Sequence, residues 1–153
     1  MIRYFDDFKP GQIFELGRHT ITKESIVAFA REYDPQPFHT DEEAAKETIY
    51  GGLIASGWQT GAIMMRLFWD GLLNECAGLG SPGIDELRWV KPVRPGDTLS
   101  LRFSVLETIP SRSKPDRGVV RSLSEVLNQH GEMVLTMKGL GMFMRRAPTQ
   151  SET

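Results

Sequence analysis

The arrangement of apolar and polar positions separates a helical first half of the chain from a second half made of strands. Near the amino end, residues 13–21 favour a strand, and the apolar residues at positions 26, 29 and 30 recur at helical spacing. Thr22 is a suitable cap for that helix. In the second half, apolar side chains alternate with polar ones over residues 98–105, which is the period of a half-buried strand.

Turn and cap residues predict the remaining elements. Asp34 precedes Pro35, and a residue before proline avoids the helical conformation, so the first helix should stop there. Thr40 and Glu43 fit a capping box at the start of a second short helix, which Gly51 and its neighbour end. We expect a long helix from 57 or 58 to about 76, a loop over 78–83, and strands over 84–91, 119–129 and 132–144, the last two forming a hairpin that turns near His130 and Gly131.

These elements predict an α+β architecture in which an antiparallel sheet wraps around the long helix. Residues 1–146 are expected to form one domain, because no linker, repeat or low-complexity block interrupts the pattern. Residues 145–153 are polar and are expected to be disordered, and 147–153 form a tail outside the domain. On the long helix, Phe68 is predicted to face inward.

The apolar run over residues 58–75 is long enough to raise the question of a membrane span. Arg66 and Asp70 lie in its middle, one helical turn apart. A helix facing lipid would tolerate these charges poorly. We therefore interpret the run as a helix buried inside a folded domain, and we expect no membrane partner.

Composition limits the classes of function. A formal net charge of −2 gives no support to nucleic acid as a partner. Cys76 is the single cysteine of the chain, which excludes an internal disulfide and suits a reducing compartment. The first residues lack the apolar stretch of a signal peptide, so the cytoplasm is the expected location.

A carboxylate and an imidazole, Asp34 and His39, stand five positions apart in a segment that contains Pro35 and Pro37. Each proline fixes one backbone angle, so the two side chains can be held with little further loss of entropy. Histidine titrates near neutral pH, and a carboxylate can orient it or share a bound water. Taken alone, the pair also fits a purely structural interpretation, with Asp34 capping the turn and His39 preceding a helix.

This segment resembles the signature of the MaoC-like dehydratases, which include the R-specific enoyl-CoA hydratases of the hotdog superfamily. The family pattern is D-x-N-P-x-H, followed by another aspartate and by a glycine before the central helix. Residues 92–97 also resemble the family's entry into a strand, and the likeness extends over about residues 8–143. Gln36 stands in place of the asparagine, and the matching residues are Asp34, Pro37, His39, Asp41 and Gly57.

The resemblance implies a hotdog fold, a homodimer, and reversible addition of water to a trans-2-enoyl thioester to give an (R)-3-hydroxyacyl thioester. It implies that Asp34 and His39 are catalytic and that the backbone N–H of Gly57 belongs to an oxyanion hole. The resemblance requires no cofactor apart from the coenzyme A or acyl carrier thioester, and no side chains have the spacing of a metal site.

Several other residues are candidates for substrate contacts. A glycine at the start of a helix lets a carbonyl approach unpaired N–H groups, although Gly57 also fits simple close packing. Ser56 is an alternative helix cap, and no motif around it suggests a nucleophile. Gln36 is one methylene longer than the asparagine of the family pattern, and its side-chain amide either braces the loop or contacts substrate. The remaining substrate-binding candidates are Trp58 and two arginines that either meet phosphates of coenzyme A or are simply solvated, Arg88 and Arg112.

Two other functions remain open on the sequence. Hotdog proteins also support thioester hydrolysis, which needs a carboxylate or water aimed at the carbonyl carbon. A module that binds acyl thioesters without turnover is the second alternative, and Gln36 is the feature that favours it.

Overall fold

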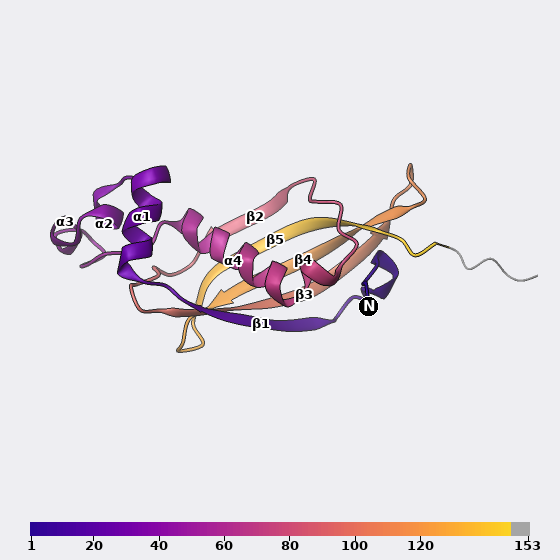
Figure 1. Cartoon of the computed structure of the whole chain (residues 1–153), viewed down its shortest axis with the longest axis horizontal. Coiled ribbons are helices and arrows are strands. Elements are labelled where there is room, and N and C mark those ends of the chain that lie inside the picture. The colour runs from indigo at the N-terminus through magenta and orange to yellow at the C-terminus, as the bar shows by residue number, and fades with distance from the viewer. Residues whose placement is uncertain (148–153) are drawn as a thin grey trace, which may run out of the picture.

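The computed structural model describes residues 1–147, and a five-stranded sheet with a central helix forms most of it (Figure 1). The elements in chain order are η1 (Phe5–Asp7), β1 (Ile13–Thr20), α1 (Lys23–Tyr33), α2 (Pro37–Thr40), α3 (Glu42–Lys46), α4 (Gly57–Gly71), η2 (Leu73–Glu75), β2 (Ile84–Trp89), β3 (Thr98–Pro110), β4 (Arg117–Leu127) and β5 (Met133–Met144).

All neighbouring strands of the sheet are antiparallel, and their order is β1-β3-β4-β5-β2. The sheet curves around α4, which packs against β1 and β3, whereas α1, α2 and α3 gather at one end of the molecule beside the start of α4 (Figure 1). The predicted α+β architecture is confirmed, and the arrangement is that of the hotdog fold. Within the described residues, no helix is both long and apolar enough to cross a membrane.

The central helix is shorter than predicted, because it ends at Gly71 and not near Cys76. Its close approach to β1 explains the glycine: a Cβ at this position would lie 2.8 Å from a side-chain carbon of Leu16. Leu72 then leaves the helical conformation, with φ −146° and ψ −53°, and a short 3-10 turn follows. The close contact with β1 favours glycine at position 71, and glycine lowers helix stability. The same residue therefore accounts for both the tight packing and the end of the helix.

Of the two helix caps predicted in the first half of the chain, one is confirmed and the other is wrong. Thr22 caps α1 as predicted, accepting the N–H of Ser25 at 3.1 Å. The predicted capping box at Thr40 was wrong, because Asp41 caps α3 and accepts the N–H groups of the second and third residues after it at 3.1 Å each. A carboxylate satisfies two donors at once and is favoured at the positive end of the helix dipole.

The carboxyl end of the described chain is held to the amino end. Arg145 and Arg146 donate hydrogen bonds to the carboxylates of Asp6 and Asp7. The prediction of disorder from residue 145 was therefore wrong for these two arginines. The rest of the predicted tail, from 148 onward, lies outside the described residues.

Phe68 faces the sheet, as predicted, and its ring stacks on that of Phe103 with 4.7 Å between centroids. The side chain is partly buried. We expect Phe68→Asp to lower the free energy of unfolding by about 2–4 kcal/mol, because a carboxylate would replace an aromatic contact in an apolar setting.

Denaturant unfolding of the Phe68→Asp protein measures this loss. Arg66→Ala is the matched control, because Arg66 is exposed on the same helix and forms only a surface ion pair with Asp70, which we expect to change stability by less than about 1 kcal/mol. An unchanged midpoint for Phe68→Asp would contradict the packing described above.

Candidate active site

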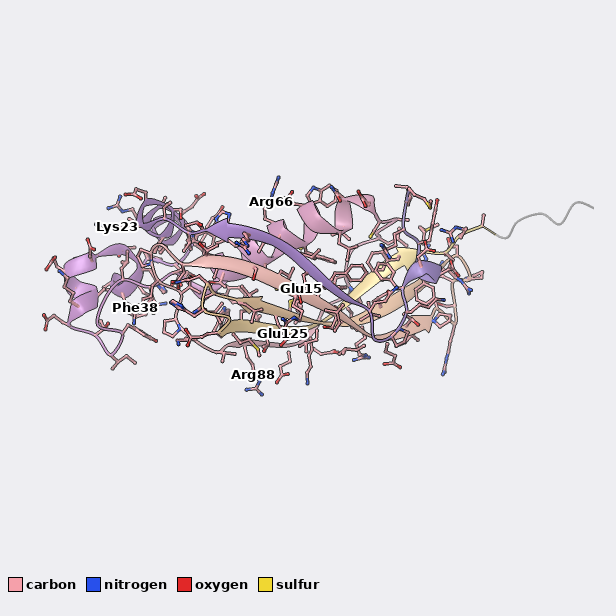
Figure 2. All side chains as sticks on the ribbon, turned by 90° about the horizontal axis from the view of Figure 1, so that it is seen from below. Glu15, Lys23, Phe38, Arg66, Arg88 and Glu125 are labelled. Carbon is pink, nitrogen blue, oxygen red and sulfur yellow. The ribbon has the colours of Figure 1, made fainter. Side chains whose placement is uncertain are left out.

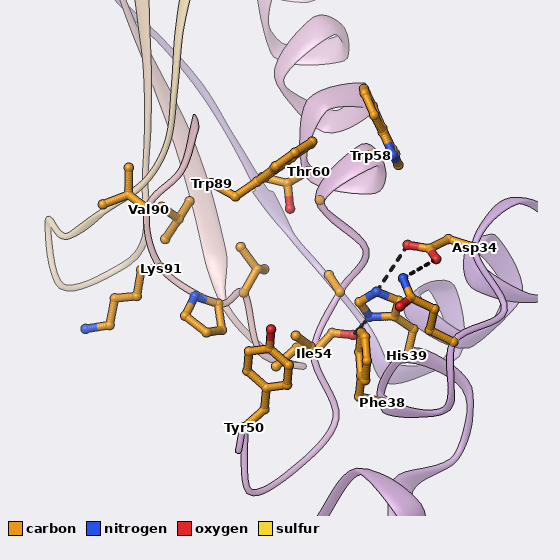
Figure 3. Close-up of a pocket in the computed structure, with 16 residues that line it drawn as sticks. Asp34, Phe38, His39, Tyr50, Ile54, Trp58, Thr60, Trp89, Val90 and Lys91 are labelled. Atoms are coloured by element: carbon orange, nitrogen blue, oxygen red, sulfur yellow. Dashed lines mark hydrogen bonds and ion pairs between the residues drawn. The ribbon is translucent and has the colours of Figure 1, made fainter. Parts of the chain in front are cut away.

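Asp34 and His39 are placed side by side by two short helical segments at one end of the molecule. α1 stops at Tyr33, and Pro37 occupies the first turn of α2. This proline has no N–H to leave unpaired there and has a backbone angle already suited to a helix. His39 therefore lies within α2, whereas Asp34 occupies the connection before it, and the Nε2 of His39 lies 3.2 Å from an Oδ2 of Asp34 (Figure 3).

The ring of His39 has a fixed orientation. Its Nδ1 lies 2.7 Å from the carbonyl oxygen of Ile54, and the side chain is only 4% exposed. A carbonyl can only accept, so Nδ1 carries the hydrogen. In the neutral ring, Nε2 is then a proton acceptor that faces Asp34 and the pocket. In the protonated ring, Nε2 donates to the carboxylate.

The carboxylate of Asp34 is surrounded by donors. The amide nitrogen of Gln36 donates to Oδ1 at 2.7 Å, and the hydroxyl of Ser56 donates to Oδ2 at 2.7 Å. Burial is the largest single influence on the pKa of Asp34 and raises it, but these hydrogen bonds and the nearby His39 together outweigh burial. The pKa of Asp34 therefore lies below its ordinary value of 3.8, and the group is charged at neutral pH.

The start of α4 borders the same pocket. Ser56 caps the helix, accepting the N–H of Trp58 at 3.3 Å while it donates to Asp34. Among residues 1–147, no acceptor is found for the N–H of Gly57, the first residue of α4. A Cβ on Gly57 would lie 2.3 Å from the Nε1 of Trp89, so a larger residue requires the indole or the start of α4 to shift. Gly57 thus packs closely against Trp89 and also lines the pocket, and its role in an oxyanion hole stays a prediction.

The pocket that these residues share has a volume of about 450 Å³. Sequence reasoning missed Tyr50 and Trp89 among its lining residues, which come from the loop before α4 and from the end of β2. Arg94 holds the loop in place by donating to the backbone carbonyls of Tyr50 and Gly52. The only feature of the sequence that could have indicated Tyr50 as a pocket residue is its position as an aromatic residue directly before a Gly-Gly pair.

The predicted substrate-binding residues differ in where they lie. Gln36 lines the pocket, and its side-chain amide donates a hydrogen bond to Asp34. Trp58 lines the pocket and is 60% exposed. The single chain does not bring the two arginines to the site. Arg88 projects outward, bonded to Glu86 (Figure 2), and Arg112 lies in the β3–β4 connection, at the opposite end of the molecule (Figure 1).

A second, larger cavity lies between α4 and the sheet, with a volume of about 830 Å³. Trp58 borders both cavities. Most of the lining is apolar and includes Met64, Met65, Phe68 and Trp69 from α4. Burial raises the pKa of the Cys76 thiol, which also lines this cavity, to about 11, so this cysteine is unreactive, as a core residue should be.

Ser56→Ala is expected to move the acidic limb of the pH–rate profile to higher pH. Removal of the hydroxyl takes one donor from the charged form of Asp34, so the pKa of this carboxyl rises. The measurement is kcat/KM of the site's reaction against pH.

Thr22→Ala is the control for the lost helix cap, because it removes the cap of α1 without touching Asp34. Both variants should lose about 1 kcal/mol of stability, but only Ser56→Ala should shift the profile. Identical profiles in the two variants would show that Ser56 acts on the fold alone.

A family model, the MaoC-like domain, matches residues 7–126. The chain belongs to the MaoC-like dehydratase family. Solved structures of this family include a MaoC-like dehydratase from Rhodospirillum rubrum, which is 44% identical, covers 95% of this chain and 99% of that chain, and has a TM-score of 0.88. The predicted family and the hotdog fold are thereby confirmed.

Two curated relatives of this MaoC-like protein extend the comparison. The uncharacterized protein YdeM of Bacillus subtilis is 35% identical over 81% of this chain and 86% of that protein. The (R)-specific enoyl-CoA hydratase of Rhodospirillum rubrum is 29% identical over 73% of this chain and 76% of its own length. The family thus includes hydratases and dehydratases of acyl thioesters.

Proposed function

We propose that this protein is an R-specific acyl-thioester hydratase, which adds water reversibly to a trans-2-enoyl thioester and forms an (R)-3-hydroxyacyl thioester. The observation that carries the proposal is the pairing of the His39 Nε2 with Asp34 beside the N–H of Gly57 in one pocket. The relative named as an (R)-specific enoyl-CoA hydratase supports the reaction class.

In the proposed reaction, a water molecule on the pocket side of the pair donates one hydrogen bond to Nε2 of neutral His39 and the other to the carboxylate of Asp34. His39 is the better base, because the low pKa of Asp34 makes this carboxylate a weak acceptor of a full proton. As His39 takes the proton, the hydroxide oxygen bonds to the β-carbon of the substrate. Asp34 stays charged and stabilises the imidazolium that forms.

The electron pair of the double bond moves toward the thioester carbonyl, whose oxygen becomes enolate-like. The N–H of Gly57 donates to that oxygen, and the positive end of the α4 dipole adds to the stabilisation. The imidazolium of His39 then returns its proton to the α-carbon from the same face. Water is consumed, no redox change occurs, and the reverse sequence is dehydration.

The apolar cavity next to the pocket suits the acyl chain. Trp58 borders both spaces, so a thioester held at Gly57 has apolar volume available beyond its reacting carbons. The carrier, coenzyme A or an acyl carrier protein, would extend from the open side of the pocket. The proposal includes no further cofactor and places the reaction in the cytoplasm.

A panel of trans-2-enoyl thioesters tests the proposed function. Loss of absorbance of the conjugated double bond measures hydration, and release of free thiol measures hydrolysis in the same samples. Hydration without thiol release supports the proposal. Thiol release without hydration would favour the thioesterase, and tight binding without either reaction would favour the non-catalytic module.

We infer that the protein assembles as a homodimer. β2 is an edge strand of the sheet, and apolar side chains on it and on α4 are exposed: Ile84, Trp89, Val90, Trp58, Met65 and Trp69. An unpaired edge next to a continuous apolar face is typical of an interaction surface. A second copy on this face would also cover the open side of the large cavity.

Light scattering should give twice the mass of one chain. Ile84→Lys on β2 is expected to shift the protein toward monomer, because a charge would be buried at the interface. Ile49→Lys is the control, since Ile49 is 94% exposed and lies outside both β2 and α4. A wild type that stays monomeric and active at nanomolar concentration would contradict the inferred assembly.

A further inference from the structure

Two buried serines interrupt the apolar lining of the large cavity. Ser122 and Ser124 on β4 are 6% and 3% exposed, and both line the cavity. Alternate residues of β4 are buried, which places both serines on the face of the strand that carries Val120 and Val126. Their neighbours across the sheet include Phe103 on β3 and Met137 on β5.

No hydrogen bond of either hydroxyl is found among residues 1–147, and neither oxygen is one of the fully enclosed atoms that lack a partner, so both hydroxyls are open to the cavity. An apolar chain that filled the cavity would displace water from both hydroxyls and leave them unpaired, so a pair of serines on this apolar surface suggests a ligand that carries a polar group. Gly139 faces Ser122 across the sheet, and a Cβ there would lie 4.0 Å from the serine oxygen. The terminal methyl group of Met137 lies closer to the same point, at 3.1 Å, so the glycine makes room for this flexible side chain, and both Gly139 and Met137 line the cavity.

We propose that Ser122 and Ser124 form a polar subsite for an oxygen on the distal part of the acyl chain, so that preferred substrates carry a hydroxyl or carbonyl group beyond the reacting double bond. This inference rests on the proposed function for the role of the cavity. A hydroxyl can donate to or accept from either kind of oxygen, which is the reason that serine suits such a subsite.

The register of β5 places the subsite along the chain. Val134 lines the catalytic pocket. Met137, opposite Ser124, lies three residues further along β5, and Gly139, opposite Ser122, lies five residues further, which corresponds to roughly 10 and 17 Å in an extended strand. The serines therefore lie well beyond the α- and β-carbons of a thioester bound in the catalytic pocket. Only an acyl chain of medium length or longer would reach them.

Small residues keep the route to the serines open on the helix side. Gly61 of α4 lines the cavity, and a Cβ on it would meet no atom within 4 Å. Gly61→Leu would fill this space without a backbone clash and with a gain in helix propensity. This variant should reduce turnover of long enoyl thioesters while that of the four-carbon crotonyl thioester is retained.

The test of the subsite compares enoyl thioesters of equal length with and without a distal hydroxyl. We expect the wild type to prefer the hydroxylated substrate by about tenfold in kcat/KM, because the unsubstituted chain leaves the serines unpaired. Ser122→Ala with Ser124→Ala should abolish the preference. Ser104→Ala is the matched control, since Ser104 is a serine of the neighbouring strand that does not line the cavity.

Binding of saturated acyl thioesters, with and without the same hydroxyl, gives a readout that does not depend on turnover. A binding preference that the double variant loses supports the subsite even if no enoyl thioester is hydrated, in which case only the proposed function fails. Equal affinity for both ligands in the wild type, or a preference unchanged in the double variant, would overturn the subsite. Circular dichroism verifies that each variant is folded.

Discussion

Hydration of an enoyl thioester is expected to fall at least about a hundredfold when Asp34 is replaced by Asn or His39 by Ala. Asp34→Asn keeps the shape of the side chain but removes the charge that stabilises the imidazolium. His39→Ala removes the Nε2 that faces the carboxylate at 3.2 Å. The initial rate of absorbance loss of the conjugated substrate measures both effects.

The two residues should act as one unit. Both serve the same water, so the double variant should lose little more than the worse single variant. His19→Ala is the control, because His19 is an exposed histidine on β1. If both single variants hydrate the substrate as fast as the wild type, the proposed site is wrong.

Folding has to be monitored separately in the histidine variant. His39 is buried and bonded to the carbonyl of Ile54, so its loss should lower the free energy of unfolding by about 1–3 kcal/mol. Asp34→Asn should also lose stability near neutral pH, because the lowered pKa of Asp34 means that its charge stabilises the folded protein there, and folding of this variant is therefore measured as well. A rate loss in a folded Asp34→Asn protein therefore reports on chemistry alone.

Gly57→Ala is expected to lower the hydration rate by about a hundredfold as well, for a steric reason. The new Cβ would lie 2.3 Å from the indole nitrogen of Trp89, so either the start of α4 or the indole must move. A displacement of about 1 Å at a group that positions the substrate typically costs about two orders of magnitude. Thermal stability should fall together with the rate.

A second substitution separates packing from chemistry at this position. Gly57→Ala combined with Trp89→Leu removes the clash, so stability should recover relative to Gly57→Ala alone. If the N–H of Gly57 acts on the thioester oxygen, the rate should recover in part, because the backbone donor is still present. Trp89→Leu alone is the control for loss of the indole from the pocket. A Gly57→Ala protein with wild-type rate and stability would contradict the geometry around α4.

Local sequence patterns determined the elements and the two central site residues. Alternation identified β3, the turn near His130 and Gly131 identified the hairpin of β4 and β5, and the apolar run identified α4. Asp34 and His39 are five positions apart within one proline-stiffened segment, so their proximity needed no long-range contact. Charge alone was a poor guide: Arg88 and Arg112 are basic but lie away from the pocket.

Only the tertiary structure decided which of these elements lie next to one another and which distant residues form contacts. β2 pairs with β5 and not with β3, its neighbour in sequence, and this pairing brings Trp89 against Gly57. Ser56 and Ile54 reach Asp34 and His39 across 22 and 15 positions of the chain. Periodicity carries no information about such distant pairs, because packing of the whole fold selects them. The sequence by itself therefore determined the family, most of the elements and the proximity of Asp34 and His39, whereas only the fold decided which donors surround that pair and which cavity adjoins it.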